Sequence, residues 1–158
     1  MDAIQSIPQD TKVYEKRTVM NTTVDKMMAF HESEDTFGKL VPPPMFGQIR
    51  EDNRTSITEG DLKFTLWMGP IPIKWHARHQ PGPTKTSFAD LMVEGPMAYW
   101  RHEHIFEAVE GGTALIDRVT ISHKPGLQGF LTRLMFDGIP LRILFFYRHL
   151  RTKWAVEA

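Results

Sequence analysis

The stretch GLQGFLTRLMFDGIPLRILFFYRHLRTKWAVEA, residues 126–158, decides the fold. Its apolar residues recur at the three-to-four spacing of one helix face, and they are Leu127, Phe130, Leu131, Leu134, Leu141, Leu144, Phe145 and Tyr147. Pro125-Gly126 marks a helix start, and several cations gather toward the C-terminal end, where they oppose the helix dipole. We therefore expect a long C-terminal helix whose apolar face needs a large apolar partner.

One tripeptide, Gly138-Ile139-Pro140, interrupts this helical pattern. Pro140 has no N–H to donate to the carbonyl of Phe136, and its ring crowds that carbonyl, so we expect a kink or a broken turn. The prediction is two helical segments that are continuous or nearly so.

Composition limits what the partner of the helix can be. The chain has 158 residues and 41% hydrophobic content, which fits one globular domain, expected over residues 11–158 after a flexible tail at residues 1–10. Basic and acidic residues are equal at 19 each, so the charge does not favour nucleic acid as a partner. The chain has no cysteine, its first residues do not resemble a signal peptide, and the apolar run 139–150 is too short to span a bilayer. We expect a cytoplasmic protein without an integral membrane segment.

The rest of the chain reads as one strand, two short helices and a series of strands. A strand is expected at 12–20, a helix at 24–31 capped by Thr22-Thr23, and a further helical turn at 35–40 that ends before Pro42-Pro43-Pro44. Six more strands are expected at 46–50, 57–68, 71–80, 86–93, 99–109 and 113–123. The breaks between them are too short for crossover helices, so the strands form an antiparallel meander. The fold class is α+β, with a curved sheet of six or seven strands wrapped around the terminal helix.

This order of elements resembles the helix-grip fold of the SRPBCC superfamily, which includes START lipid-transfer domains, birch-pollen-type allergens and polyketide cyclases. The stretches FTLWMGPIPIKWHARH, VEGPMAYWRHEHIF and LTRLMFDGIPLRILFFYRHLRT are similar to those of bacterial ligand-binding proteins of this superfamily, some described as cyclase/dehydrase-like. The resemblance covers residues 11–155. It implies a cavity between sheet and helix, and it implies no cofactor and no metal. It does not decide activity, because this fold hosts binding, transport and catalysis.

Period-two alternation identifies the side chains that face the helix. In the strand 99–109, Trp100, His102, His104 and Phe106 share a face, and the same parity turns Asp90 and Asp117 inward. Trp67 is left as an exposed aromatic or an edge contact. We expect the following residues to contact a ligand in the implied cavity: Phe64, Leu66, Met68, Trp75, Phe88, Trp100, His102, His104, Phe106, Leu134, Leu141 and Phe145.

The inward cluster Asp90, His102, His104 and Asp117 is where chemistry could occur, since buried carboxylates need partners and imidazole titrates near neutrality. Three interpretations stay open for it: a structural network, a polar end of the pocket that orients a ligand, and a general acid and base. His-x-His with a nearby carboxylate also suits a facial metal triad, but the pattern is short and common, so no metal is expected.

The remaining histidine and the end of the terminal helix give weaker indications of function. His31 is expected at the surface or as a cap, and Arg148-His149-Leu150-Arg151 as a solvated helix end. The terminal helix carries apolar residues on all its faces, so a homodimer is possible. The function expected is binding of a small hydrophobic molecule, such as a lipid, polyketide, isoprenoid or aromatic metabolite. The alternatives are a cyclase or dehydratase that uses the inward cluster, and a regulatory interaction module that uses Trp67 and the helix end.

Overall fold

A computed structural model describes residues 7–158, and within them the chain forms seven strands and four helices. The strands are β1 (Lys12–Met20), β2 (Phe46–Asp52), β3 (Gly60–Met68), β4 (Ile71–Pro81), β5 (Ser87–Glu94), β6 (Tyr99–Val109) and β7 (Gly112–Ser122). The helices are α1 (Val24–Glu32), α2 (Thr36–Leu40), α3 (Gly126–Phe136) and α4 (Gly138–Val156). Most of the tail expected at residues 1–10 lies outside the described residues, but Asp10 accepts a hydrogen bond from Ser122 at 3.0 Å.

The strands form one antiparallel sheet in the order β1-β7-β6-β5-β4-β3-β2. The α+β helix-grip layout is therefore confirmed, and the first strand in sequence closes the sheet beside the last. The strand expected from residue 57 begins later, at Gly60, because Ser56 and Glu59 pair across a tight turn before it. Gly69, at a φ of +59°, makes the turn that joins β3 to β4.

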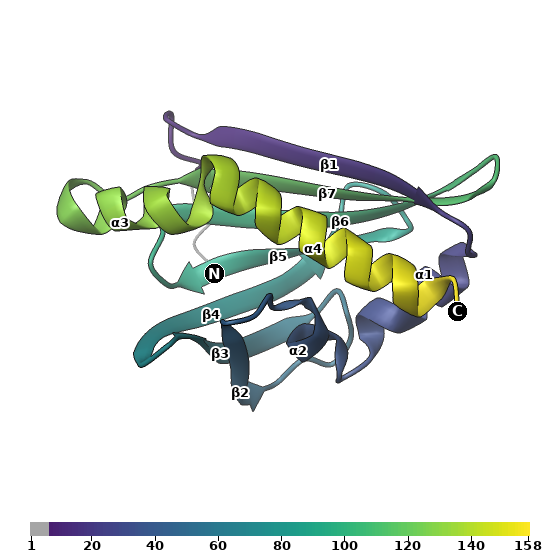
Figure 1. Ribbon diagram of the computed structural model, residues 1–158, viewed down its shortest axis with the longest axis horizontal. Helices are drawn as coiled ribbons and strands as arrows, with labels where there is room; N and C mark the ends of the chain where they lie inside the picture. Colours follow the sequence, from purple (N-terminus) through teal and green to yellow (C-terminus); the bar gives the residue numbers. More distant parts are fainter. Residues whose placement is uncertain (1–6) are drawn as a thin grey trace.

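Helix α4 crosses the concave face of the sheet, and α1 and α2 lie beside it over the same face (Figure 1). Phe145 and Leu141 of α4 are buried against Trp75, Trp100 and the neighbouring strands. A second apolar cluster packs α1 and the end of α4 on the sheet, and its buried members are Met20, Met27, Phe88, Phe106, Leu115 and Val156. The layers leave room between these two clusters, where the polar groups described below are found.

The C-terminal helix is broken at Asp137, one residue before Gly138. Asp137 is extended at a φ of −143°, its carboxylate accepts the N–H of Gly138 at 2.8 Å, and Gly138 adopts a φ of +55°. Pro140 then lies in the first turn of α4, where its missing N–H removes no helix hydrogen bond. His123 contacts Asp137 at 2.8 Å and so ties the break to the end of β7.

Because of this break, the apolar face of α3 is exposed to solvent. We expected this face to be covered by the sheet, but it is exposed, with Leu127 at 73%, Phe130 at 57%, Leu131 at 47% and Leu134 at 58%. The reason is that α3 lies past one end of the sheet and the chain changes direction only after it, at Asp137, so α4 and not α3 lies over the concave face (Figure 1).

Trp67 is an edge contact rather than a free aromatic. Its ring stacks on Phe46 with centroids 6.1 Å apart, and its Nε1–H donates to Gln48 at 3.0 Å. Within residues 7–158, no helix combines the length and the apolar character that crossing a bilayer requires.

Candidate functional site

Three neighbouring strands bring the expected His and Asp residues together on the concave face. The register sets Asp90 of β5 opposite His102 of β6, and His104 of β6 opposite Asp117 of β7. Because side chains alternate along a strand, His102 and His104 project to the same side, where they are 5% and 4% exposed. The alternation of β6 is therefore enough to place the two imidazoles side by side beneath the helices.

The hydrogen bonds of this cluster run diagonally rather than straight across the sheet. His104 donates Nε2–H to Asp90 at 2.8 Å, and His102 donates Nε2–H to Asp117 at 2.6 Å. The two rings stack with centroids 3.7 Å apart. The Nδ1 atom of His104 lies 3.3 Å from Asp117 but outside hydrogen-bonding geometry, so that contact is electrostatic.

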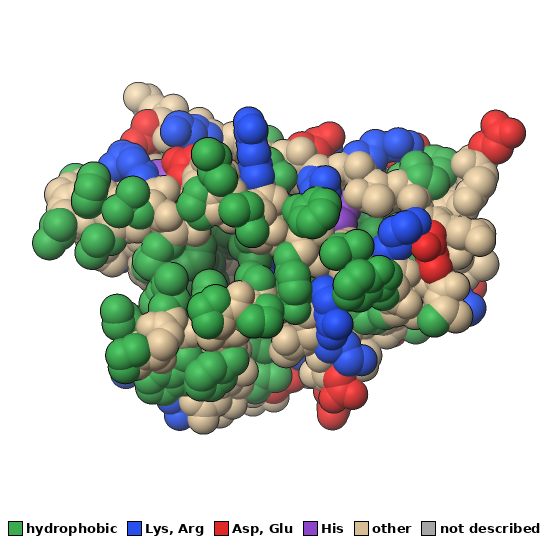
Figure 2. All heavy atoms as spheres, viewed as in Figure 1, with side chains coloured by type: hydrophobic (Ala, Val, Ile, Leu, Met, Phe, Trp, Pro, Cys, Tyr) green, Lys and Arg blue, Asp and Glu red, His purple; other side chains and the backbone are tan. Residues whose placement is uncertain are grey.

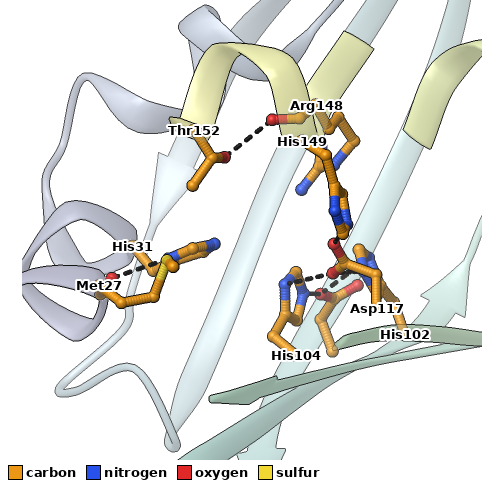
Figure 3. A network of polar contacts seen from close by, with 9 residues as sticks. Met27, His31, His102, His104, Asp117, Arg148, His149 and Thr152 are labelled. Carbon is orange, nitrogen blue, oxygen red and sulfur yellow. Dashed lines mark hydrogen bonds and ion pairs between the residues drawn. The ribbon is translucent and has the colours of Figure 1, made fainter. Parts of the chain in front are cut away.

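The terminal helix adds a third histidine to the network. His149 of α4 donates Nε2–H to the second oxygen of Asp117 at 2.7 Å, and its Nδ1 lies 2.7 Å from the hydroxyl of Thr18 on β1. Both oxygens of Asp117 are thus occupied, and its carboxylate joins β6, β7 and α4 (Figure 3). We expected His149 in a solvated helix end; it is 2% exposed, because that face of α4 packs on the sheet.

The histidines hold both carboxylates in the ionised form. Burial raises the pKa of Asp117, but the charge of His102, the hydrogen bonds from His102 and His149, and the nearby imidazole of His104 bring that pKa well below the usual range. Burial likewise opposes ionisation of Asp90, and the hydrogen bond from His104 together with the charges of both inward histidines lowers its pKa.

The two stacked histidines differ in protonation. Burial lowers the pKa of His102 to about 4, and the charge of His104 adds to that effect, so His102 is neutral at pH 7. Burial also lowers the pKa of His104, but Asp117 and Asp90 outweigh it and raise the pKa above the usual value. Neighbouring imidazoles with separated pKa values are the arrangement that acid and base roles require.

His31 belongs to the same region, which corrects our expectation that it lies at the surface. It is 8% exposed, its Nδ1–H donates to the carbonyl of Met27 at 2.8 Å, and its ring packs on Phe106 and His104. Burial and the nearby charge of His104 lower the pKa of His31 to about 3, so the ring is neutral. Helix α1 turns the side that carries His31 toward β6. The hydrophobic periodicity of the helix does not reveal how the helix is rotated on the sheet.

A cavity of about 160 Å³ lies between the sheet and the helices. Its apolar part is lined by Val41, Met45, Phe64, Leu66, Trp75, Ala77, Trp100, Phe136 and Leu144. Its polar part is lined by His31, Ser33, Glu34, Thr36, Arg54, His79, Asp90, His102, His104 and Arg148. Figure 2 shows a hollow bordered by apolar side chains, between the junction of α3 with α4 and the side of the molecule formed by α2 and β2.

The expected ligand contacts divide between this lining and the core. The lining includes Phe64, Leu66, Trp75, Phe88, Asp90, Trp100, His102 and His104. The core, outside the lining, includes Met68, Phe106, Leu141 and Phe145, because packing between helix and sheet covers them. Leu134 lies on the exposed face of α3, and Asp117 lies beneath the histidines rather than at the cavity wall.

Three of the lining residues that were not expected, His31, His79 and Arg148, belong to the polar part of the cavity. The alternation of β4 had turned His79 inward with Trp75, and its ring stacks on Phe88 with centroids 5.7 Å apart. Arg148 follows Leu144 by one helical turn and so shares its face, which was a usable signal.

One oxygen of Asp90 and one nitrogen each from His102 and His104 lie within 4.8 Å of one another, a spacing that could hold a metal ion. In this structure Asp90 and His104 are already hydrogen-bonded to each other. His102 has its Nδ1 3.9 Å from Asp90, on the side of the ring that does not bind Asp117.

Comparison with known proteins identifies the fold. No protein-family model matches the chain, and no curated protein matches it in sequence. Solved structures do match: the Zhui aromatase/cyclase of a Streptomyces species has 14% identity and a TM-score of 0.64 over 93% of this chain and 92% of its own. A START superfamily protein from Mycobacterium smegmatis has 8% identity and a TM-score of 0.66, over 92% and 97%. A norcoclaurine synthase point mutant from Thalictrum has 12% identity and a TM-score of 0.67, over 96% and 98%. The chain therefore has the helix-grip fold, as these structures do.

Proposed function

We propose that the protein is a cytoplasmic carrier or sensor that binds a small hydrophobic molecule in the cavity between the sheet and α4. The observation that supports this best is the lining itself, which is aromatic and aliphatic at one end and polar at the other. Burial of an apolar ligand body stabilises a complex, and a few placed polar groups orient it. The size of the cavity suits one aromatic ring or an aliphatic group of similar size, since a cavity of about 150 Å³ holds benzene.

Filling the cavity tests the proposal. Ala77 lines the cavity on β4, so Ala77→Phe would occupy the space of the ligand, whereas Ala108→Phe adds the same ring at an exposed position of β6. We expect isothermal titration calorimetry to detect binding of indole, a neutral probe, and we expect Ala77→Phe to weaken it by about tenfold or more. Ala108→Phe should bind indole as the unmodified protein does. Failure of the unmodified protein to bind indole, or equal binding by Ala77→Phe that is folded by circular dichroism, contradicts the proposal.

A second candidate function is a cyclase or dehydratase activity, and the separated pKa values of His102 and His104 favour it. Neutral His102 could accept a proton from an activated carbon, and protonated His104 could donate one to a leaving hydroxyl. The test is loss of water from a β-hydroxy ketone with an aromatic substituent, followed by ultraviolet absorption of the conjugated product. His104→Gln should abolish turnover and leave indole affinity unchanged, because acid catalysis acts on the transition state. If the unmodified protein shows no turnover, the dehydratase activity is excluded for β-hydroxy ketones of this class. The proposed binding function is not affected by that result.

A further inference from the structure

Arg148 is a cation in the cavity wall for which residues 7–158 offer no carboxylate partner. It lies on the inward face of α4, one turn from Leu144, which lines the cavity, and one turn from Thr152, which is buried. Figure 3 shows its side chain directed from α4 into the space between His31 and the histidines of β6. Its Nε atom is shielded from solvent and has no hydrogen-bond partner, and among residues 7–158 no carboxylate pairs with its guanidinium.

The absence of a partner is unusual for a group of this kind. A guanidinium removed from water loses hydration that only hydrogen bonds or an opposite charge can replace. Arg54, the other arginine in the lining, is paired with Asp52 at 2.8 Å. The guanidinium of Arg148 lies over the ring of Phe145, with its Cζ 5.9 Å from the ring centroid. Burial lowers its pKa, while the charges of Asp117 and Asp90 raise it, and the group remains a cation at neutral pH.

The carboxylates of the cluster are already used by other groups. Asp117 binds His102 through one oxygen and His149 through the other, and Asp90 binds His104. Protonation of His104 also offsets the charge of Asp90, one of the two carboxylates that line the cavity. Glu34 also lines the cavity, but it is exposed to solvent. In the buried polar part, an anion therefore meets Arg148 as an available cation, and the carboxylate of Asp90 there is already paired with His104.

We propose that Arg148 binds the anionic headgroup of the cavity ligand, and that the ligand is a small carboxylate with an aromatic or aliphatic body. This inference rests on the proposed function and narrows it to a substrate class. The planar guanidinium fork matches the two oxygens of a carboxylate, and the apolar lining of Trp75, Trp100 and Phe136 receives the rest of the molecule.

Two probes of nearly equal shape separate the charge from the apolar body. We would titrate 3-phenylpropanoate and its neutral amide, 3-phenylpropanamide, into the protein at pH 7 by calorimetry. The unmodified protein should bind the carboxylate about tenfold more tightly than the amide, or better, because a charge-assisted pair forms only with the carboxylate. Arg148→Met, which keeps the apolar stem, should lose this preference. Arg142→Met removes an exposed cation from the same helix and should retain it.

The outcomes distinguish this inference from the function on which it rests. Equal affinity for the two probes, or an unchanged preference in Arg148→Met, overturns the role of Arg148 and leaves the cavity as a binding site. Failure of both probes and of indole to bind the unmodified protein overturns both proposals.

Thermal unfolding of the unliganded protein gives a second readout. Arg148→Met should raise the midpoint by about 2 to 5 °C, because it removes a partly buried cation for which residues 7–158 offer no carboxylate partner. A lowered midpoint would mean that the chain itself uses the charge of Arg148, which also overturns the inference.

Discussion

At the scale of single residues, Asp117 has the largest share of the buried polar network. It is 2% exposed, accepts hydrogen bonds from His102 and His149, and lies 3.3 Å from His104. Its position at the centre of three imidazoles makes it a structural group first, since it lies beneath the cavity wall rather than in it.

We expect Asp117→Asn to lower the free energy of unfolding by about 3 kcal/mol, because removal of one partner leaves the other buried groups uncompensated. Asp61→Asn is the matched control, since Asp61 is likewise paired with two basic side chains, here His76 and Arg78, but on the outer face of the sheet with 28% side-chain exposure. The control should lose less than about 1 kcal/mol. Urea unfolding measures both, and equal losses would show that burial does not set the strength of these pairs.

At the scale of elements, the terminal helix does two different things on either side of Asp137. Helix α4 buries Leu141, Phe145 and Val156 against the sheet and exposes apolar residues only on its opposite side. Helix α3 buries Phe136 but presents most of its apolar residues to solvent. The same hydrophobic pattern therefore predicts packing for one segment and a surface for the other. An exposed apolar face of this kind is the feature that supports the homodimer as a proposal.

Substitution of one leucine from each helix tests this difference. Leu134→Glu should change the free energy of unfolding by less than about 0.5 kcal/mol, because Leu134 is 58% exposed. Leu141→Glu should cost more than about 4 kcal/mol, because it buries a carboxylate at a position that is 2% exposed. Chemical denaturation at low protein concentration distinguishes them. A large loss in Leu134→Glu would mean that α3 is covered, and sedimentation velocity at higher concentration would show whether a second copy covers it.

At the scale of the whole molecule, the buried histidines make stability depend on pH. His31 and His102 are neutral when folded, with pKa values lowered to about 3 and about 4, and they take up protons when the chain unfolds. Their contribution is complete above the unfolded value near 6.5 and is lost as the pH falls toward the folded values. The raised pKa of His104 acts oppositely: its contribution is complete below about 6.5 and is lost at higher pH. The lowered pKa values of Asp90 and Asp117 stabilise the folded state above about pH 3.8, and this stabilisation is lost as the pH falls below that value.

We therefore expect the free energy of unfolding to fall as the pH decreases from 6.5 to 4.5. His31→Asn should reduce that dependence by about one proton, or about 1.4 kcal/mol per pH unit near its steepest point, while its amide keeps the bond to Met27. Urea titrations of both proteins at pH 6.5 and pH 4.5 give the comparison. Parallel losses in the two proteins would show that His31 does not titrate on unfolding.

Much of the fold and part of the site followed from the sequence, for a local reason. Strand alternation has a period of two that neighbouring residues fix by themselves, so the inward placement of His102, His104, Asp90 and Asp117 could be read without knowing the sheet. The turns between strands could be placed from the Gly, Pro and Asp-Asn breaks. Because these breaks are too short for crossover helices, they predicted antiparallel pairing, which the structure confirms.

The helices could not be resolved in the same way, because an amphipathic helix has a face but the sequence does not say what that face meets. Only the tertiary structure turned His31 toward β6, placed His149 on Asp117 and set Arg148 in the cavity. The change of direction at Asp137 likewise decided that the apolar face of α3 stays in solvent. The sequence by itself determined which side chains share a strand face, since that depends on bonds along the chain. The diagonal hydrogen bonds and the unpaired arginine depend on distances between elements, which packing alone sets.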